Sequence, residues 1–284
     1  MAVVKPREQG IGIFDSGLGG LSVLADLIHV HPKDEYHYFA DTQFAPYGEK
    51  VREQVIQRVL EVTDTLLQRH IRLLVVACNT ATSAAVEVLR QRLTIPVVGM
   101  EPALKPAVFG EKPLRIVVAA TPLTLKEKKF EALLHQNQGF HEITPLPCPG
   151  LVEIIEKAGP GSPQVDEKLA ELLAPLQKTP IHRLVLGCTH YVLIRPQWQQ
   201  AVGKGTQLVD GNAGAVRQAL RLLPAIDEGK DQPWHTPIHL MTSAAGQMPR
   251  EMMKAILLEQ LLQRGLPSNW MEQQMKIILE EDKR

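Results

Sequence analysis

The pattern LLVVACNT, residues 73–80, occurs a second time in this chain as RLVLGCTH, residues 183–190. In both, a short run of leucine and valine stops at a cysteine that polar residues follow. Such a run predicts a buried parallel strand, with the cysteine at the carboxyl edge of the sheet, where open α/β sheets bind ligands. Because Cys188 follows Cys78 by 110 residues, we expect two similar half-chains with one thiol on each side of one substrate. Two thiols so placed can remove a proton from one face of a carbon and return it to the other.

The composition of the whole chain disfavours several classes of protein. Its 284 residues are enough for two domains, and 31 basic and 31 acidic residues give a formal net charge of zero, which favours neither nucleic acid nor a membrane as partner. No apolar stretch approaches a membrane span, and residues 1–10 lack the apolar core of a signal peptide. The three cysteines are widely spaced, without a Cys-x-x-Cys pair, so we expect reduced thiols, no metal site and a cytoplasmic protein.

Strand-like and helix-like segments alternate along almost the whole chain. Besides the two cysteine strands, the predicted strands are residues 11–15, 36–41, 96–100, 115–120, 141–146, 207–210 and 238–241. The predicted helices are residues 21–30, 51–69, 83–92, 126–135, 151–157, 166–177, 212–223 and 250–264. This alternation predicts an α/β fold of two similar, pseudo-twofold-related domains, each a parallel sheet covered by helices, with the active site in the cleft between them. We place the first domain at residues 1–99 and 211–284 and the second at residues 100–210.

The two repeated cysteines are also expected at the beginnings of helices. Backbone N–H groups and the helix dipole at such a position lower the pKa of a thiol and favour the thiolate, which is the basic form. Asn79, Thr80, Thr189 and His190 supply hydrogen-bonding groups at the same places. Either cysteine alone would more often be a buried core residue, but their matching positions favour a function. Cys148, between two prolines, lacks this context, and we expect it to be structural.

Two glycine-containing turns follow the first two predicted strands. DSGLGG, residues 15–20, has neither the spacing of a dinucleotide-binding turn nor the lysine of a P-loop, so we expect no nucleotide cofactor. Asp15 is either a helix cap or a group that contacts a substrate ammonium or orients a proton-transfer group. PYG, residues 46–48, predicts a turn in which free backbone N–H groups around Tyr47 and Gly48 can hold a carboxylate.

Two further ionisable residues lie where the predicted cleft can use them. His190 is either a capping residue or a group that tunes the nearby thiol or relays its proton. Glu156, on the predicted helix 151–157, is either solvated or paired with His190. The methionine-rich C-terminal helix has helical spacing of apolar residues, which favours a core or subunit contact over a cofactor site.

Five motifs, in this order and spacing, resemble those of the glutamate racemases. They are DSGLGG at 15–20, PYG at 46–48, ACNTA at 77–81, GMEP at 99–102 and LGCTHY at 186–191. The resemblance runs from about residue 11 to about residue 216. It implies an enzyme that interconverts L- and D-glutamate without a cofactor and supplies D-glutamate for peptidoglycan. It also implies a small-molecule substrate as the partner, and the family is often dimeric.

The resemblance implies roles for individual residues. Cys78 and Cys188 match the two cysteines that act as acid and base on opposite faces of the α-carbon, Cys78 on D-glutamate and Cys188 on L-glutamate. Asp15, His190 and Glu156 match auxiliary proton-transfer groups. The matching substrate contacts are Asp15, Ser16, Tyr47, Gly48, Asn79, Thr80, Thr189 and His190.

Three segments depart from the family pattern. The family usually has Gly-Asp-Thr before its PYG motif, and here Ala40 replaces that glycine. Leu123 replaces the glycine of a usual Thr-x-Gly-Thr, and residues 209–212 read VDGN where the family usually has VDSG. The last two concern the rim of the cleft and the affinity for substrate. Two alternatives stay open: a racemase of another amino acid such as aspartate, and a binding or regulatory protein on the same fold. Aspartate racemases usually carry Cys-Thr-Glu where residues 188–190 read Cys-Thr-His, which favours glutamate.

Overall fold

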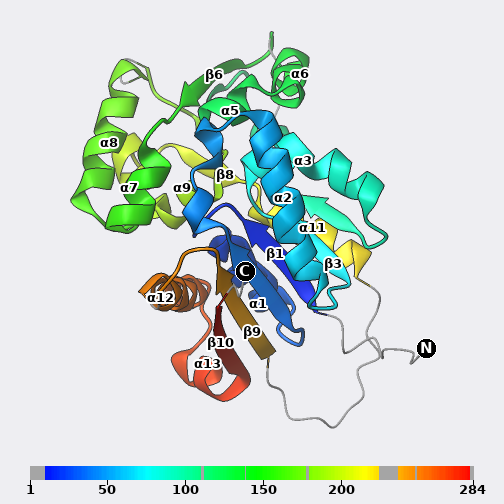
Figure 1. The fold of residues 1–284 in the computed structure, drawn as a ribbon. Helices are drawn as coiled ribbons and strands as arrows, with labels where there is room; N and C mark the ends of the chain where they lie inside the picture. The colour runs from blue at the N-terminus through cyan, green and yellow to red at the C-terminus, as the bar shows by residue number, and fades with distance from the viewer. Residues whose placement is uncertain are drawn as a thin grey trace.

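Figure 1 shows the computed structural model of the chain, which describes residues 10–109, 112–137, 139–176, 179–223, 236–246 and 248–281. Residues 1–9, where the sequence predicts no signal peptide, lie outside the described residues. The described strands form two sheets, and each pair of neighbouring strands is parallel. This is the arrangement that the alternation of strand and helix predicts.

The larger sheet takes its strands from both ends of the chain, in the order β10-β9-β2-β1-β3-β4. Its strands are β1 (Ile11–Asp15), β2 (Tyr36–Ala40), β3 (Leu73–Val76), β4 (Val97–Gly99), β9 (Thr236–Thr242) and β10 (Met275–Glu281). The smaller sheet has the order β6-β5-β7-β8. Its strands are β5 (Arg115–Ala120), β6 (Glu142–Pro147), β7 (Arg183–Leu186) and β8 (Gln207–Asp210).

The two sheets share one topology. The order β2-β1-β3-β4 within the larger sheet is repeated as β6-β5-β7-β8 in the smaller one. Cys78 follows β3 and Cys188 follows β7, so the two cysteines occupy equivalent positions in the repeat. The prediction of two similar α/β halves is therefore confirmed. The domain boundaries at residues 99/100 and 210/211 stay a prediction, although both fall between strands of different sheets.

Helices cover both faces of the larger sheet, as Figure 1 shows. Alternate residues of β1 face opposite sides, so that Ile11 and Ile13 pack on one side and Phe14 on the other. On the isoleucine side lie α1 (Leu21–Val30), α11 (Asn212–Leu222) and α12 (Met248–Gln263), and on the phenylalanine side lie α2 (Arg52–Leu67) and α3 (Asn79–Arg92). The burial of Met253 and Leu257 in α12 confirms that this methionine-rich helix belongs to the core.

The remaining helices accompany the smaller sheet or join elements of the larger one. They are α4 (Leu104–Ala107), α5 (Pro122–Lys126), α6 (Lys128–Asn137), α7 (Leu151–Ala158), α8 (Pro163–Leu173), α9 (Thr189–Leu193), α10 (Arg195–Val202), α13 (Ser268–Gln274) and the 3₁₀ turns η2 (Thr42–Phe44), η3 (Tyr47–Glu49) and η4 (Ala174–Leu176). One apolar cluster contains Leu21 of α1 together with Leu151 of α7 and Trp198 of α10. The apolar core is therefore continuous between the two halves of the chain.

Several element boundaries differ from the predicted ones. The predicted helix 126–135 is two helices, α5 and α6, and α8 begins at Pro163, a residue suited to a first helical turn. α3 begins at Asn79 rather than at residue 83, because Cys78 itself is the N-cap. The strand β10 is absent from the prediction, which ended the chain's strands at β9.

Candidate active site

Both repeated cysteines lie at the amino ends of helices, directly after strands of the two sheets. Cys78 is the N-cap of α3, where its Sγ accepts a hydrogen bond from the backbone N–H of Ala81 at 3.4 Å. Cys188 is the N-cap of α9. Cys78 is only 5% exposed and Cys188 only 8% exposed. The fold therefore places one nearly buried thiol on each half of the repeat.

Burial dominates the acid–base behaviour of Cys78. Its Sγ lies 3.4 Å from the hydroxyl oxygen of Ser16. Burial and the nearby charge of Asp15 raise the pKa of Cys78 to about 12, although the hydrogen bonds with Ser16 and Ala81 act in the opposite direction. At Cys78 the helix N-terminus acts in the predicted direction through the N–H of Ala81, but burial outweighs it, so the prediction of a lowered pKa is wrong for this residue. Removal from water penalises the charged sulfur more than the N–H groups stabilise it.

Cys188 begins a chain of three groups that ends on α7. Its Sγ lies 3.8 Å from Nδ1 of His190, and Nε2 of His190 lies 2.5 Å from Oε1 of Glu156. The same carboxylate oxygen accepts a hydrogen bond from the N–H of Leu18 at 2.7 Å. Burial alone lowers the pKa of His190, but its contacts with Cys188 and Glu156 outweigh burial, and the pKa lies well above its usual value. Of the two alternatives for Glu156, the structure shows the pairing with His190, which places a cationic imidazole beside a thiol.

Asp15 ends β1 and connects the two halves of the chain. One carboxylate oxygen accepts a hydrogen bond from the N–H of Gly17, and the other accepts one from the hydroxyl of Thr189, both at 2.9 Å. The N-cap of α1 is Gly20, without a side-chain cap, so Asp15 is not a helix cap. Burial raises the pKa of Asp15 to about 6, against the opposing effects of the His190 charge and the two hydrogen bonds. Asp15 is therefore a weaker acid than a solvent-exposed aspartate.

The glycines of loop 15–20 let this loop lie directly against the second half. A Cβ at Gly17 would lie 2.0 Å from Oε1 of Glu156, and a Cβ at Gly19 would lie 2.5 Å from the backbone nitrogen of His190. Neither glycine has a positive φ. The two glycines are therefore needed because the halves approach each other closely at this loop. From the sequence alone, this reason cannot be told apart from the need for a sharp turn.

The predicted contact residues on the first half differ in their surroundings. Ser16 and Asn79 are both buried. Ser16 lies against the Cys78 thiol in space, and Asn79 follows Cys78 in the chain as the first residue of α3. The hydroxyl of Tyr47 instead donates to Asp41 at 2.6 Å, and Arg58 donates to both oxygens of the same carboxylate at 2.7 Å. Burial and the Asp41 charge raise the pKa of Tyr47 above its usual value. The Tyr47 side chain is thus held in a buried ion-pair network, which leaves its backbone as the predicted contact.

A group of threonine hydroxyls joins the two halves near the same place. Thr80 lies 3.0 Å from Thr121 and 3.2 Å from Thr124, oxygen to oxygen, and all three residues are buried. Gly48 approaches so closely that a Cβ there would lie 2.5 Å from the Cβ of Thr121. Thr121 and Thr124 were not predicted as site residues. The signal available in the sequence was that they flank Leu123, the departure from the family pattern.

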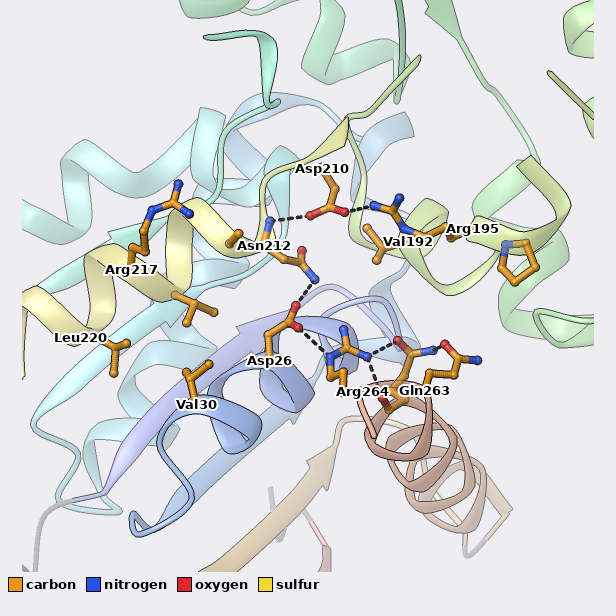
Figure 2. A pocket seen from close by; sticks show the side chains of 14 residues that line it. Asp26, Val30, Val192, Arg195, Asp210, Asn212, Arg217, Leu220, Gln263 and Arg264 are labelled. Carbon is orange, nitrogen blue, oxygen red and sulfur yellow. Dashed lines mark hydrogen bonds and ion pairs between the residues drawn. The ribbon is translucent and has the colours of Figure 1, made fainter. Parts of the chain in front are cut away.

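A cavity of about 580 Å³ lies elsewhere, where the chain returns to the larger sheet (Figure 2). Asp26 accepts hydrogen bonds there from Arg264 at 2.6 Å and from Asn212 at 2.9 Å, and Arg195 pairs with Asp210. The residues that line this cavity include none of the predicted site residues. The thiols therefore do not open into it, and the candidate site is the buried interface between the two halves.

The interface brings together groups with different acid–base character. On one side, the Cys78 thiol lies beside a serine hydroxyl and near the carboxyl of Asp15. On the other side, the Cys188 thiol lies beside the His190 imidazole, whose opposite nitrogen contacts a carboxylate. Such an arrangement can take a proton on one side and deliver one on the other. Among the described residues, no helix combines the length and apolar composition needed to cross a membrane.

Known proteins resemble this chain over most of its length. The sequence model of the family described as Asp/Glu/hydantoin racemase matches residues 21–219. A glutamate racemase of Clostridium novyi (strain NT) is 44% identical over 217 residues, which are 76% of this chain and 84% of the relative. The crystal structure of Escherichia coli glutamate racemase, in complex with L-glutamate and the activator UDP-MurNAc-Ala, has a TM-score of 0.79 at 30% identity and covers 96% of this chain and 98% of that one. The glutamate racemase isoform RacE1 of Bacillus anthracis has a TM-score of 0.75 at 26% identity, with coverage of 96% and 98%.

Proposed function

Because this chain belongs to the Asp/Glu/hydantoin racemase family, we propose that it interconverts L- and D-glutamate by proton transfer at the α-carbon. One observation carries the proposal. Cys78 and Cys188 occupy equivalent positions after equivalent strands of two repeated sheets, and both are nearly buried at the interface between the halves. A planar intermediate held there would meet one thiol on each face.

The proposed reaction needs one thiolate and one thiol. The thiolate takes the α-proton, the electron pair of the broken C–H bond stays on the substrate, and the opposite thiol donates a proton to the other face of the carbon. The two cysteines thereby exchange protonation states. We expect Cys78 to act on D-glutamate and Cys188 on L-glutamate, and a thiolate left by one turnover is ready for the opposite enantiomer.

The neighbours of each thiol support this exchange. His190, as a cation beside Cys188, stabilises the thiolate there, and Glu156 keeps the imidazole oriented through its short contact with Nε2. On the other side, the high pKa of Cys78 means that its thiolate needs an added positive charge, and the ammonium group of a bound amino acid supplies one. Asp15, a weaker acid than a solvent-exposed aspartate, can hold that ammonium or move a proton.

The interface also suits the charge that develops during the reaction. Removal of the α-proton places negative charge on the substrate carboxylate, which backbone and hydroxyl donors can stabilise. The donors nearest the thiols come from Ser16, Asn79, Thr80 and Thr189, together with the backbone at the start of α3. Since the site residues are buried, we expect the two halves to separate for substrate to reach the thiols and to close before proton transfer, which excludes water.

The first experiment is incubation of the purified chain with L-glutamate in deuterated water, without an added cofactor. Optical rotation and deuterium at the α-carbon are followed together. Loss of rotation accompanied by α-deuterium is the expected result. Exchange with aspartate but not with glutamate would move the specificity within the family, and no exchange with any amino acid would favour a binding or regulatory protein.

Three cysteine variants then test the two-base proposal. Cys78→Ala and Cys188→Ala should each abolish racemisation, and each should retain α-proton exchange only for the enantiomer that faces the remaining thiol. Cys148→Ala is the matched control, because Cys148 is equally buried but donates to the backbone carbonyl of Leu146 at 3.3 Å. Full racemisation by either of the first two variants would refute the two-base mechanism. His190→Asn should lower turnover more than it weakens substrate binding.

The wider setting of the reaction follows from the same proposal. D-glutamate made by this chain would supply peptidoglycan synthesis, and a cytoplasmic location and a homodimer fit a family of this kind. These expectations have their own tests. Analytical ultracentrifugation of the purified chain decides the oligomeric state, and depletion of the protein in a cell that depends on it should be rescued by external D-glutamate.

A further inference from the structure

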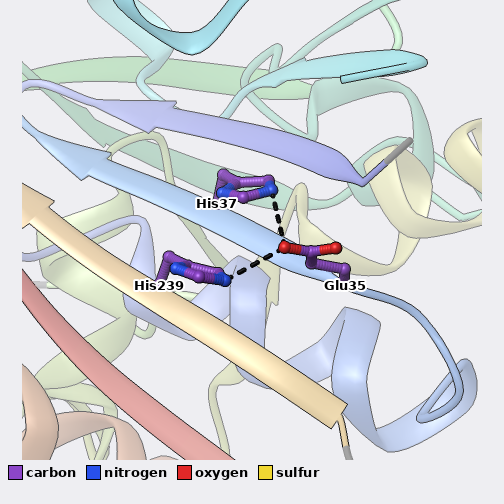
Figure 3. Close-up of side chains that lie close together, drawn as sticks. All are labelled: Glu35, His37 and His239. Atoms are coloured by element: carbon purple, nitrogen blue, oxygen red, sulfur yellow. Dashed lines mark ion pairs between the residues drawn. The ribbon is translucent and has the colours of Figure 1, made fainter. Parts of the chain in front are cut away.

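A second group of ionisable side chains lies far from the cysteines. Glu35 immediately precedes β2, His37 is the second residue of β2, and His239 lies on β9 (Figure 3). The two histidines are register partners on neighbouring strands. The cysteines follow the carboxyl ends of their strands, whereas this group gathers around the beginning of β2. It therefore belongs to a different part of the larger sheet.

The three side chains point their ligand atoms at one another. Nε2 of His37 lies 3.3 Å and Nε2 of His239 lies 3.0 Å from the same carboxylate oxygen of Glu35. One ligand atom from each of the three residues lies within 4.8 Å of the other two. In a tetrahedral site with metal–ligand bonds of about 2.0–2.2 Å, neighbouring ligand atoms are separated by about 3.3 Å. The spacing around Glu35 is close to that value.

The second nitrogen of His239 is held by another carboxylate. Nδ1 of His239 contacts the carboxylate of Glu280 on β10, and an ionised carboxylate only accepts hydrogen bonds, so this nitrogen carries the hydrogen. Nε2 of His239 faces Glu35: the protonated ring donates a hydrogen bond to this carboxylate from Nε2, whereas the neutral ring presents a lone pair that can bind a metal ion. A metal ion between Nε2 of His239 and the Glu35 carboxylate would take the place of that proton and would also be within reach of Nε2 of His37.

The surroundings meet the other requirements of a metal site. Glu280 holds His239 in place as the carboxylate partners of metal-binding histidines do, and Arg69 pairs with Glu280. The two imidazole rings are stacked with centroids 4.6 Å apart, which keeps both edges turned toward Glu35. The Glu35 side chain is 32% exposed, so an ion and a completing water ligand can reach it. Nδ1 of His37 has no hydrogen-bond partner within the described part of the chain, so His239 is the better oriented of the two ligands.

We propose that Glu35, His37 and His239 bind one divalent ion of the zinc class and thereby fasten strand β9 to strand β2. Two imidazole nitrogens and one carboxylate oxygen are a ligand set that zinc accepts, with water in the fourth position. The ion would act on stability and not on proton transfer, because its ligands are separate from the thiol site. This inference does not depend on the proposed racemase activity.

The test uses the full chain, freed of metal with a chelator and then titrated with zinc chloride. Calorimetry should show one site per chain, and zinc at about 100 times its dissociation constant should raise the Tm by about 5 °C. Glu35→Gln and His239→Asn should each weaken binding at least about 10-fold, and Glu280→Gln should weaken it by about 10-fold through the orientation of His239. His29→Asn, at an exposed position of α1, is the matched control and should bind normally.

Spectroscopy separates this site from zinc held by the active-site thiols. X-ray absorption at the zinc edge should show nitrogen and oxygen ligands at about 2.0–2.2 Å, without sulfur at about 2.3 Å. Sulfur ligation, or zinc binding that Cys78→Ala removes and Glu35→Gln leaves unchanged, would overturn the proposal. The absence of zinc binding would also overturn the proposal, and the contact between His239 and Glu35 would then be a hydrogen-bonded ion pair. Because Glu35 is partly exposed, Glu35→Gln should fold and retain α-proton exchange.

Discussion

Replacing Asp15 by asparagine should stabilise the folded protein at neutral pH and at the same time lower its turnover number. Asp15 is fully buried, and its carboxylate has two hydrogen bonds but forms no ion pair with any residue that the structure describes. Asparagine keeps the shape, its amide oxygen can accept from the N–H of Gly17, and its NH₂ group can donate to the hydroxyl of Thr189, which is free to rotate. The substitution therefore removes the charge with little change in packing.

The magnitude follows from the pKa of Asp15, which burial raises from 3.8 to about 6. A raised pKa in the folded state means that the folded protein binds the proton more tightly than the unfolded chain does. The stability that this provides is complete below pH 3.8 and is lost as pH rises through 6. At pH 7 the ionised carboxylate destabilises the fold by about 3 kcal/mol, and this cost falls to about 1–2 kcal/mol at pH 5 and to less than about 1 kcal/mol at pH 4. Asp15→Asn should recover these amounts.

Urea unfolding of wild type and Asp15→Asn, followed by tryptophan fluorescence between pH 5 and pH 8, measures the difference. The matched control is Asp41→Asn, because Asp41 is equally buried but is paired with Arg58. The control should destabilise the protein, since it leaves the arginine unpaired. An Asp15→Asn variant that is less stable than wild type at pH 7, or whose advantage does not shrink toward pH 5, would refute the reasoning. Turnover equal to wild type would remove Asp15 from proton transfer.

Three other changes test the contacts described above. Gly17→Ala places a Cβ 2.0 Å from Oε1 of Glu156, so the carboxylate or the loop must move, and turnover should fall by at least about 10-fold with a small change in Tm. Glu156→Gln removes a charge that raises the pKa of the imidazole it contacts, so the titration of that imidazole, followed by NMR, should move to lower pH; an unchanged titration would contradict the assigned contact. Arg58→Ala leaves the buried carboxylate of Asp41 unpaired and should cost about 3–5 kcal/mol in denaturant unfolding, whereas Arg92→Ala, at an exposed ion pair, should cost less than about 1 kcal/mol.

Strong local patterns in the sequence predicted most of the sheet architecture. The strands at 11–15, 115–120 and 207–210 have the predicted bounds, because each contains a short apolar run that turn-forming residues follow. β10 escaped prediction because its sequence, MKIILEE, mixes charged and apolar residues without alternation at an edge of the sheet. Its strand conformation depends on pairing with β9, which lies more than 30 residues earlier in the chain, so the local sequence does not predict it.

The positions of the two thiols in the fold could be predicted from the sequence, but their electrostatics could not. The repeated cysteine pattern placed both thiols after equivalent strands, whereas the pairing of Glu156 with His190 was one of two alternatives that the sequence left open. The pKa of Cys78 was expected to fall and instead rises, because the degree of burial depends on the close packing of two separate halves. The histidines of the proposed metal site lie on separate strands more than 200 residues apart, so only the strand register of β2 and β9 brings them together.

The larger sheet draws strands from both ends of the chain, and this has a consequence for synthesis on the ribosome. About 200 residues separate the end of β2 from the end of β9, its neighbour in the sheet. At typical elongation rates, a nascent chain carries the open edge of β2 for on the order of 10–40 s before β9 emerges. All strands of the smaller sheet leave the ribosome within that interval. The smaller sheet can therefore form while the larger one still exposes an unpaired strand, a stage at which the growing chain is most vulnerable to aggregation and has most use for a chaperone.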